Sequence, residues 1–284
     1  MKKFLAILLA LSLLMALLLP SVSYAKPGGQ HDQHDGDDDV ERYAIIIGIS
    51  DYPGDLNVLQ GGLDVFYSDD DAYAVRKALI ISGFKPKNIT VLVNKKATYS
   101  SILSEIAELD EKVDEGDEVL FFFSGHVVAD ENPSAAGALL VWGDDLNELE
   151  PRMLMDDVLK TAFDDFETDN IVFIFDSCYA ARFSELAGDG RVLIGATGPD
   201  GISGEYGPAY AALGAVPLPG IGWMEQGLFT YFFFVQGIIR KWADANLDRT
   251  VTYAEAFQYA KPILEYWTLA NQGSGLDEIP VWID

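Results

Sequence analysis

The sequence predicts an α/β fold with a mainly parallel sheet and helices on both of its faces. From Glu41 onward, short apolar runs alternate with segments of helical periodicity, which is the element order of repeated βαβ units. Two of these runs, 119–123 and 171–175, contain only phenylalanine, leucine, isoleucine and valine. Runs without polar residues are typical of strands that a parallel sheet buries on both sides. These observations predict three layers: helices, sheet and helices.

The boundaries of the elements follow from caps, turn residues and apolar spacing. Ser68 is a candidate cap for the first helix, and Thr98 opens the second, in which apolar residues recur on one face until Gly116. The strands are predicted at 42–49, 88–93, 119–123, 171–175 and 191–195, with a short edge at 280–283. The helices are predicted at 69–82, 98–115, 156–166, 228–243 and 253–264.

The amino-terminal residues predict export. Lys2 and Lys3 precede an apolar stretch at 4–19, and Ala25 ends a small-x-small cleavage site. We therefore expect residues 1–25 to be a signal peptide that is cleaved after Ala25. The protein is expected to be secreted or extracytoplasmic.

The charge of the chain limits its partners. Residues 26–40 are predicted to form an acidic, disordered linker, and 41–284 a single domain. The whole chain has 19 basic and 45 acidic residues, a formal net charge of −26. Such a charge repels nucleic acid and anionic membranes, and no second apolar stretch is long enough to span a bilayer. Neither partner is expected after signal cleavage, whereas metal ions and basic peptides are favoured.

A thiol and an imidazole are the candidate reactive groups. The chain has one cysteine, Cys178, and one histidine outside the acidic linker, His126, and each lies just beyond one of the two apolar runs. Because the carboxyl ends of parallel strands meet at one edge of a sheet, we expect both groups at the same rim. A cysteine nucleophile with a histidine base requires such a pair. The alternative is a buried, unreactive thiol and a hydrogen-bonded structural histidine.

Short motifs occur in a fixed order between Tyr43 and Tyr259. They are the strand 44–49 followed by Tyr52-Pro53-Gly54, then Asp71-Ala72, Ser124-Gly125-His126, Asp176-Ser177-Cys178 and Gly227-Leu228-Phe229-Thr230. In order and spacing they resemble the caspase-like cysteine peptidases, particularly the metacaspases and their prokaryotic relatives. The resemblance implies a caspase-like fold and an endopeptidase that acts on polypeptides without an organic cofactor.

By position, the resemblance also assigns roles to individual residues. Cys178 is implied to attack the scissile carbonyl, and His126 to transfer protons. The backbone amides of Cys178 and Val127 would form the oxyanion hole. Three side chains would line an acidic pocket for an arginine or lysine before the cut: Asp71, Ser124 and Asp176.

Two positions depart from the family pattern. Val127 replaces the usual glycine after the histidine, and Ala180-Ala181 replaces a Ser-Gly pair after the cysteine. A β-branched residue restricts the backbone where the oxyanion hole is expected. These departures favour an inactive homologue, whereas the retained thiol and imidazole favour an enzyme.

The segment 244–255 has the spacing of a calcium-binding loop. Oxygen-bearing residues occupy its first, third, fifth, seventh and twelfth positions: Asp244, Asn246, Asp248, Thr250 and Glu255. Arg249 stands at the sixth position, where glycine is normal. We expect Ca²⁺ here; the alternative is that these residues only cap and connect two helices. Asp144 and Asp145 are a second candidate pair.

Together these features predict a secreted cysteine endopeptidase with a Cys-His dyad that cleaves after basic residues and responds to calcium. The alternative is a catalytically inactive caspase-fold homologue that serves as a calcium-binding or protein-interaction module. A peptidyl electrophile that carries arginine would separate the two, because only the enzyme would be labelled by it.

Overall fold

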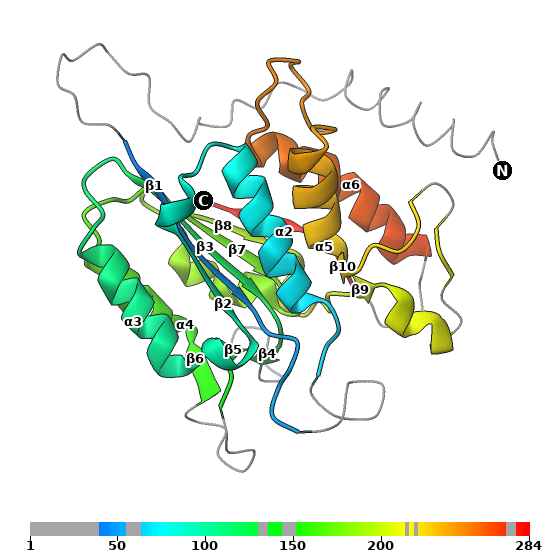
Figure 1. The fold of residues 1–284 in the computed structure, drawn as a ribbon, viewed down its shortest axis with the longest axis horizontal. Coiled ribbons are helices and arrows are strands. Elements are labelled where there is room, and N and C mark those ends of the chain that lie inside the picture. Colours follow the sequence, from blue (N-terminus) through cyan, green and yellow to red (C-terminus); the bar gives the residue numbers. More distant parts are fainter. Residues whose placement is uncertain are drawn as a thin grey trace. The chain divides into compact units, whose positions relative to one another are not determined.

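A six-stranded sheet with the order β11-β8-β7-β3-β1-β2 forms the centre of the fold in a computed structural model (Figure 1). Its strands are β1 (Arg42–Gly48), β2 (Ile89–Val93), β3 (Glu118–Ser124), β7 (Ile171–Asp176), β8 (Val192–Gly195) and β11 (Val281–Ile283). The first five run parallel to their neighbours, and β11 pairs antiparallel with β8 at one edge. The predicted mainly parallel sheet is confirmed.

The structure describes residues 40–54, 64–129, 136–143, 152–213, 216–218, 221–270 and 277–284. The predicted signal peptide, the linker up to residue 39, and the candidate pair Asp144 and Asp145 lie outside the described residues. All described residues belong to one compact unit. Within them, no helix is both long enough and apolar enough to cross a membrane.

Helices cover both faces of the sheet, as the sequence predicts. On one face lie α3 (Tyr99–Asp110) and α4 (Asp156–Asp164). On the other lie α2 (Ser68–Ile81), the single turn α5 (Leu228–Thr230) and α6 (Tyr253–Ala270) (Figure 1). Thr98 caps α3 in a capping box with Ser101, as expected. Ser68, by contrast, is the first residue of α2 and caps nothing.

Successive residues of β3 face opposite sides of the sheet, which explains its lack of polar side chains. Phe121 and Phe123 join the core beneath α3 and α4, whereas Leu120 and Phe122 join the core beneath α2 and α6. All four side chains are fully buried. Burying each one contributes about 1.5–3 kcal/mol, so β3 is held firmly from both faces.

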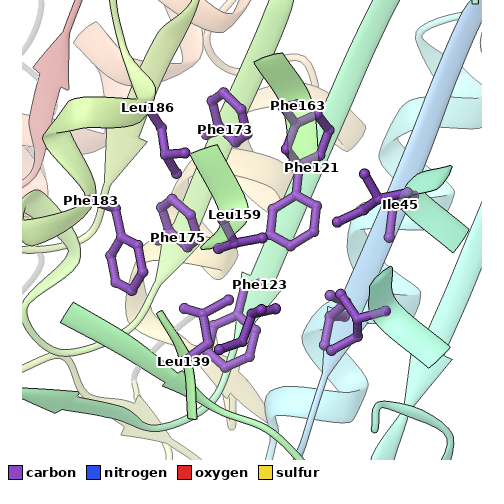
Figure 2. Close-up of a cluster of buried hydrophobic side chains, with 14 of the residues drawn as sticks. Ile45, Phe121, Phe123, Leu139, Leu159, Phe163, Phe173, Phe175, Phe183 and Leu186 are labelled. Atoms are coloured by element: carbon purple, nitrogen blue, oxygen red, sulfur yellow. The ribbon is translucent and has the colours of Figure 1, made fainter. Parts of the chain in front are cut away.

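Aromatic rings fill the core between β3, β7 and α4. Figure 2 shows the ring of Phe121 beside those of Phe163 and Phe173, and the ring centroids of Phe163 and Phe173 are 5.0 Å apart in a T-shaped arrangement. Phe175 stacks on Phe183 at 4.7 Å. Close packing of this kind resists displacement, so β3 and β7 are rigid supports for whatever lies beyond their carboxyl ends.

Two small sheets are not indicated by the sequence. One sheet contains β4 (Val127–Ala129), β5 (Gly137–Leu140) and β6 (Met153–Met155), and the other contains β9 (Glu205–Tyr206) and β10 (Gln226–Gly227). Strands of two to four residues are too short to have a readable period.

Helix boundaries near the carboxyl end also differ from the prediction. The sequence predicts one α-helix over 228–243, but after α5 the chain forms a π-helical segment, Tyr231–Ile239, and then leaves the helix. The segment itself is apolar on nearly all of its sides. The spacing of its apolar residues therefore has no period that would distinguish a π-helix from an α-helix. Helix α6, which contains Pro262, continues past the predicted end at Leu264 to Ala270.

Candidate active site

The strand ends of β3 and β7 lie side by side. These parallel strands pair in register from Val119 with Ile171 to Ser124 with Asp176. His126 and Cys178 each follow two residues after that last pair, and both side chains are half-buried. The structure therefore brings the two predicted catalytic residues to neighbouring positions on one edge of the sheet.

A buried tyrosine fixes the backbone of His126. The amide of His126 donates to the hydroxyl of Tyr52 at 2.9 Å, and this hydroxyl donates to the carbonyl of Leu140 at 3.2 Å. The rings of Tyr52 and His126 lie 5.2 Å apart. Gly125 is required between β3 and His126, because its φ is +151° and a Cβ there would stand 2.7 Å from the Tyr52 hydroxyl. Tyr52 lies in a recognised motif, but the sequence alone suggested no role for it.

Cys178 lies at the start of a tight turn after β7. The hydroxyl of Thr197, which follows β8, donates to the carbonyl of Ser177 at 3.0 Å and accepts from the amide of Ala180 at 3.1 Å. Tyr179 adopts a left-handed conformation with φ of +57°. Such a conformation costs about 1–3 kcal/mol for a residue other than glycine, and it often occurs at functional sites.

The surroundings of Cys178 favour its neutral thiol over the thiolate. Burial, the largest effect, raises its pKa to about 11. The negative charges of Glu278 and Asp176 add to the increase, and a hydrogen bond from the amide of Ser203 opposes it. A nucleophilic thiolate therefore needs a base or a change of surroundings at neutral pH.

The three residues predicted to line the acidic pocket for a basic side chain lie together. Ser124 donates to Oδ2 of Asp71 at 2.8 Å, and the amide of Gly227 donates to Oδ1 at 2.9 Å. Asp176 accepts from the amide of Thr230 at 2.9 Å. At Gly227 a Cβ would overlap Oδ2 of Asp176 and stand 3.0 Å from Oδ2 of Asp71. The two carboxyl groups thus face the same few atoms of backbone.

The pKa of each of these carboxyl groups is raised. For Asp71, burial is the largest cause and the charge of Asp176 is the next. For Asp176, burial again dominates, and hydrogen bonds to Thr230 and Ser203 oppose it. Two carboxylates this close cannot both ionise easily without a cation.

Two further acids, which the sequence did not single out, lie near Asp176: Glu205 is half-buried and Glu278 is buried. Glu205 on β9 accepts from the amides of Phe66 and Tyr67, each at 3.0 Å, and Glu278 accepts from the amide of Gly204 at 2.8 Å. Burial is the main cause of the raised pKa in both, and the charge of Asp176 adds to it.

In the described part of the chain, no lysine or arginine forms an ion pair with any of these four acids. Neither of the two glutamates lies at the end of a strand that the sequence predicts or in a motif of the resemblance, so no local signal marks them.

The positions that depart from the family pattern have defined surroundings. Val127 is the first residue of β4 and pairs with Leu139 in the small antiparallel sheet, so the backbone after His126 is extended. Ala180 is fully buried, and its Cβ lies 2.7 Å from the position that a Cβ at Gly195 would take. Only a small residue fits between this turn and β8.

The loop 244–252 connects the π-helical segment to α6. Side-chain oxygens at the first, third and fifth positions accept from backbone amides two to five residues ahead, as with Asp244 and Arg249 at 3.0 Å. Arg249 takes the left-handed conformation, with φ of +72°, that the sixth position of a calcium loop demands. Glu255 accepts from the amide and hydroxyl of Thr252 and so caps α6.

This loop does not form a preassembled metal centre. Over the residues that the structure describes, no group of three or more histidine, cysteine, aspartate or glutamate side chains is arranged to hold a metal ion.

A parallel sheet between two helical layers, with a thiol and an imidazole at adjacent strand ends, is the architecture of a caspase-like α/β protein. The caspase domain model of the peptidase C14 family matches residues 41–251, and the chain belongs to this family. Its fold is similar to the crystal structure of protein GSU0716 from Geobacter sulfurreducens, with a TM-score of 0.54 and 15% identity over 86% of this chain and 92% of that chain. No curated protein matches the chain. Family membership is consistent with a cysteine peptidase that acts on polypeptides.

Proposed function

We propose that this protein is a secreted cysteine endopeptidase that cleaves polypeptides after arginine or lysine. The observation that carries the proposal is the register of β3 and β7, which puts His126 and Cys178 at one edge of the sheet, close to the buried carboxyl group of Asp176. Export is supported by the signal-like sequence at 1–25.

In the proposed reaction, His126 takes the proton of the Cys178 thiol as the sulfur attacks the scissile carbonyl carbon. The carbon–nitrogen bond then breaks, and the departing amine receives the proton from His126. Water next hydrolyses the thioester and releases the acid product. General acid–base catalysis of this kind contributes about 10²–10⁴-fold. Oxyanion stabilisation by the amides of Cys178 and Val127 would add about 3 kcal/mol per donor.

Specificity for a basic side chain follows from the charge of the pocket. Asp71 and Asp176 are buried, and neither has a lysine or arginine partner in the described part of the chain. A guanidinium or ammonium group of the substrate would supply the missing cation and would donate hydrogen bonds to both carboxylates. Ser124 orients Asp71 through its 2.8 Å hydrogen bond and would keep that carboxyl group facing the substrate.

The second candidate function is an inactive caspase-fold protein that binds calcium or another protein. It is favoured by Val127 at the proposed oxyanion hole and by the raised pKa of Cys178, which both act against catalysis.

We expect an irreversible peptidyl electrophile with arginine at its reactive end to label Cys178. The chain has a single cysteine, so the modified peptide is identified without ambiguity by mass spectrometry. The same reagent with norleucine in place of arginine is the matched control and should label at least about tenfold more slowly, because a buried carboxylate discriminates by charge. Equal labelling by the two reagents would argue against an acidic pocket that selects a basic side chain. No labelling by either reagent would favour the inactive alternative.

We also propose that Ca²⁺ binds at 244–255. Support comes from the five oxygen-bearing residues at ligand spacing and from the left-handed conformation of Arg249, which lets a residue other than glycine take the sixth position. Arg249 also adds a positive charge, so the affinity is expected to be weak, about 10⁻⁴–10⁻³ M, as in extracellular modules.

Calcium at ten times its dissociation constant should raise the melting temperature, since a ligand that binds only the folded state stabilises it by about 1.4 kcal/mol at that concentration. Glu255→Gln should remove most of this increase, because the twelfth position supplies the strongest carboxylate ligand. Thr252→Ala is the matched control, since it disturbs the same helix cap without removing a carboxylate. Identical calcium responses in wild type and Glu255→Gln would show that the loop is only a helix connector.

A further inference from the structure

The segment 201–204 (hereafter the bridge) connects the nucleophile to the rest of the site. Its backbone carbonyls accept hydrogen bonds from three different parts of the chain. The bonds are Tyr179 to Gly201 at 2.9 Å, Asp277 to Ile202 at 2.9 Å, and Leu228 to Gly204 at 2.8 Å. The bridge is therefore fixed by the turn after β7, by the segment before β11 and by α5.

Ser203 in this bridge touches both the nucleophile and the acidic pocket. Its hydroxyl donates to Oδ1 of Asp176 at 3.0 Å. Its backbone lies near Cys178, where it lowers the pKa of the thiol and so favours the thiolate. A displacement of the bridge would therefore disturb substrate recognition and thiol ionisation together.

Glu278 holds the bridge from the carboxyl-terminal side. One of its carboxyl oxygens accepts from the amide of Gly204 at 2.8 Å, and the side chain is 1% exposed. Its own amide donates to the hydroxyl of Thr268 on α6 at 2.9 Å, and that hydroxyl contacts its carbonyl at 3.2 Å. Glu278 lies beyond residue 251, where the match to the caspase domain ends.

We propose that Glu278 is a positioning residue of this active site, which holds the bridge in place beside Asp176 and the turn that contains Cys178. The proposal rests on the cysteine peptidase function proposed above and adds to it a part of the chain outside the family match. A buried glutamate in this place has a cost, because its charge is poorly solvated, and a structural hydrogen bond alone could be supplied by a neutral amide.

The charged groups around Cys178 come from several elements. Asp176 on β7 and Glu278 both raise the pKa of the thiol, and His126 lies at the neighbouring end of β3. Asp71 and Glu205 interact with Asp176, and the charge of Asp176 raises the pKa of each of them.

Arg182, the cation nearest to Cys178 in sequence, contacts residues outside this cluster. Its Nε donates to the carbonyl of Pro199 at 2.7 Å, and its guanidinium pairs with Asp200. Removing one negative charge should therefore favour the thiolate, because the cluster has an excess of acids.

The test is the pH dependence of Cys178 alkylation by iodoacetamide, which reports on one residue because the chain has one cysteine. In Glu278→Gln, the amide oxygen still accepts from Gly204, but the charge is gone. We expect the midpoint of the alkylation profile to fall by about one pH unit, because Glu278 is ionised in the alkaline range where the thiol titrates. Glu265→Gln, which removes a partly exposed α6 carboxylate paired with Lys261, should leave the midpoint unchanged.

A second variant separates the hydrogen bond from the charge. Glu278→Ala removes the acceptor for Gly204, so KM for an arginine peptide should rise at least about tenfold, whereas Glu278→Gln should keep KM near that of wild type. The proposal is overturned if Glu278→Gln has the alkylation midpoint of Glu265→Gln. Absence of peptide cleavage by the wild type, together with a shifted midpoint in Glu278→Gln, would refute the peptidase function and leave the positioning role intact.

Discussion

Replacing Cys178 with alanine is expected to reduce cleavage of an arginine peptide by at least about 10⁴-fold, because the sulfur is the nucleophile of the proposed reaction. The fold should be unchanged. Cys178 is half-buried in a turn that is held by Thr197 through the backbone of Ser177 and Ala180, and none of these bonds uses the thiol. The measurements are kcat/KM with an internally quenched peptide and a thermal unfolding curve.

His126→Ala is the partner variant, and the double variant is the decisive control. Removing either member of a catalytic unit removes the function of the whole unit. The activity of the double variant should therefore lie within about threefold of the activity of each single variant. The backbone amide of His126 still donates to Tyr52 in the alanine variant, which protects the local structure. Cleavage by Cys178→Ala at a rate close to wild type would refute the assignment of the nucleophile.

The second large effect is expected at Asp176. Asp176→Asn should reduce kcat/KM for arginine and lysine peptides by about a hundredfold or more, because a basic side chain would enter the pocket with one carboxylate fewer to pair with it. Cleavage of a matched norleucine peptide, however slow in wild type, should change much less. Asp176→Ala should lose activity on all substrates, since the amide of Thr230 and the hydroxyl of Ser203 would also lose their acceptor.

Asp117→Asn is the matched control for Asp176→Asn. Asp117 is also buried and accepts from backbone amides, of Glu41 at 2.7 Å and Asp114 at 3.1 Å, but it lies at the opposite end of the sheet, just before β3. Its substitution should lower stability without altering the ratio of arginine to norleucine cleavage. A substrate profile dominated by aspartate or by apolar residues before the cut would contradict an acidic pocket that selects basic side chains.

The features that could be predicted are those with strong local signals. The runs at 119–123 and 171–175 predict β3 and β7 because both faces of these strands are buried, so no polar residue interrupts them. Thr98 predicts the start of α3 because its hydroxyl accepts an amide three residues ahead, a contact within a single turn. Short strands such as β9 and β10 have no such signal.

The acidic cluster shows the limit of local signals most clearly. Glu205 accepts from the amide of Tyr67, 138 residues earlier in the chain, and Asp71 accepts from the amide of Gly227, 156 residues later. Nothing in the neighbouring residues of any of these positions encodes those distances. Motif order linked Asp71 with Asp176, but Glu205 and Glu278 belong to no motif.

The sequence by itself determined the sheet, the two helical layers and the positions of His126 and Cys178 beyond their strands, since hydrophobic periodicity and strand ends depend on residues close together in the chain. Only the tertiary structure decided which side chains surround the thiol. Packing of α2, β9, α5 and the segment before β11 onto the sheet brings three carboxyl groups, those of Asp71, Glu205 and Glu278, close to Asp176. The electrostatics of the site depend on these distances through space and not on separation along the chain.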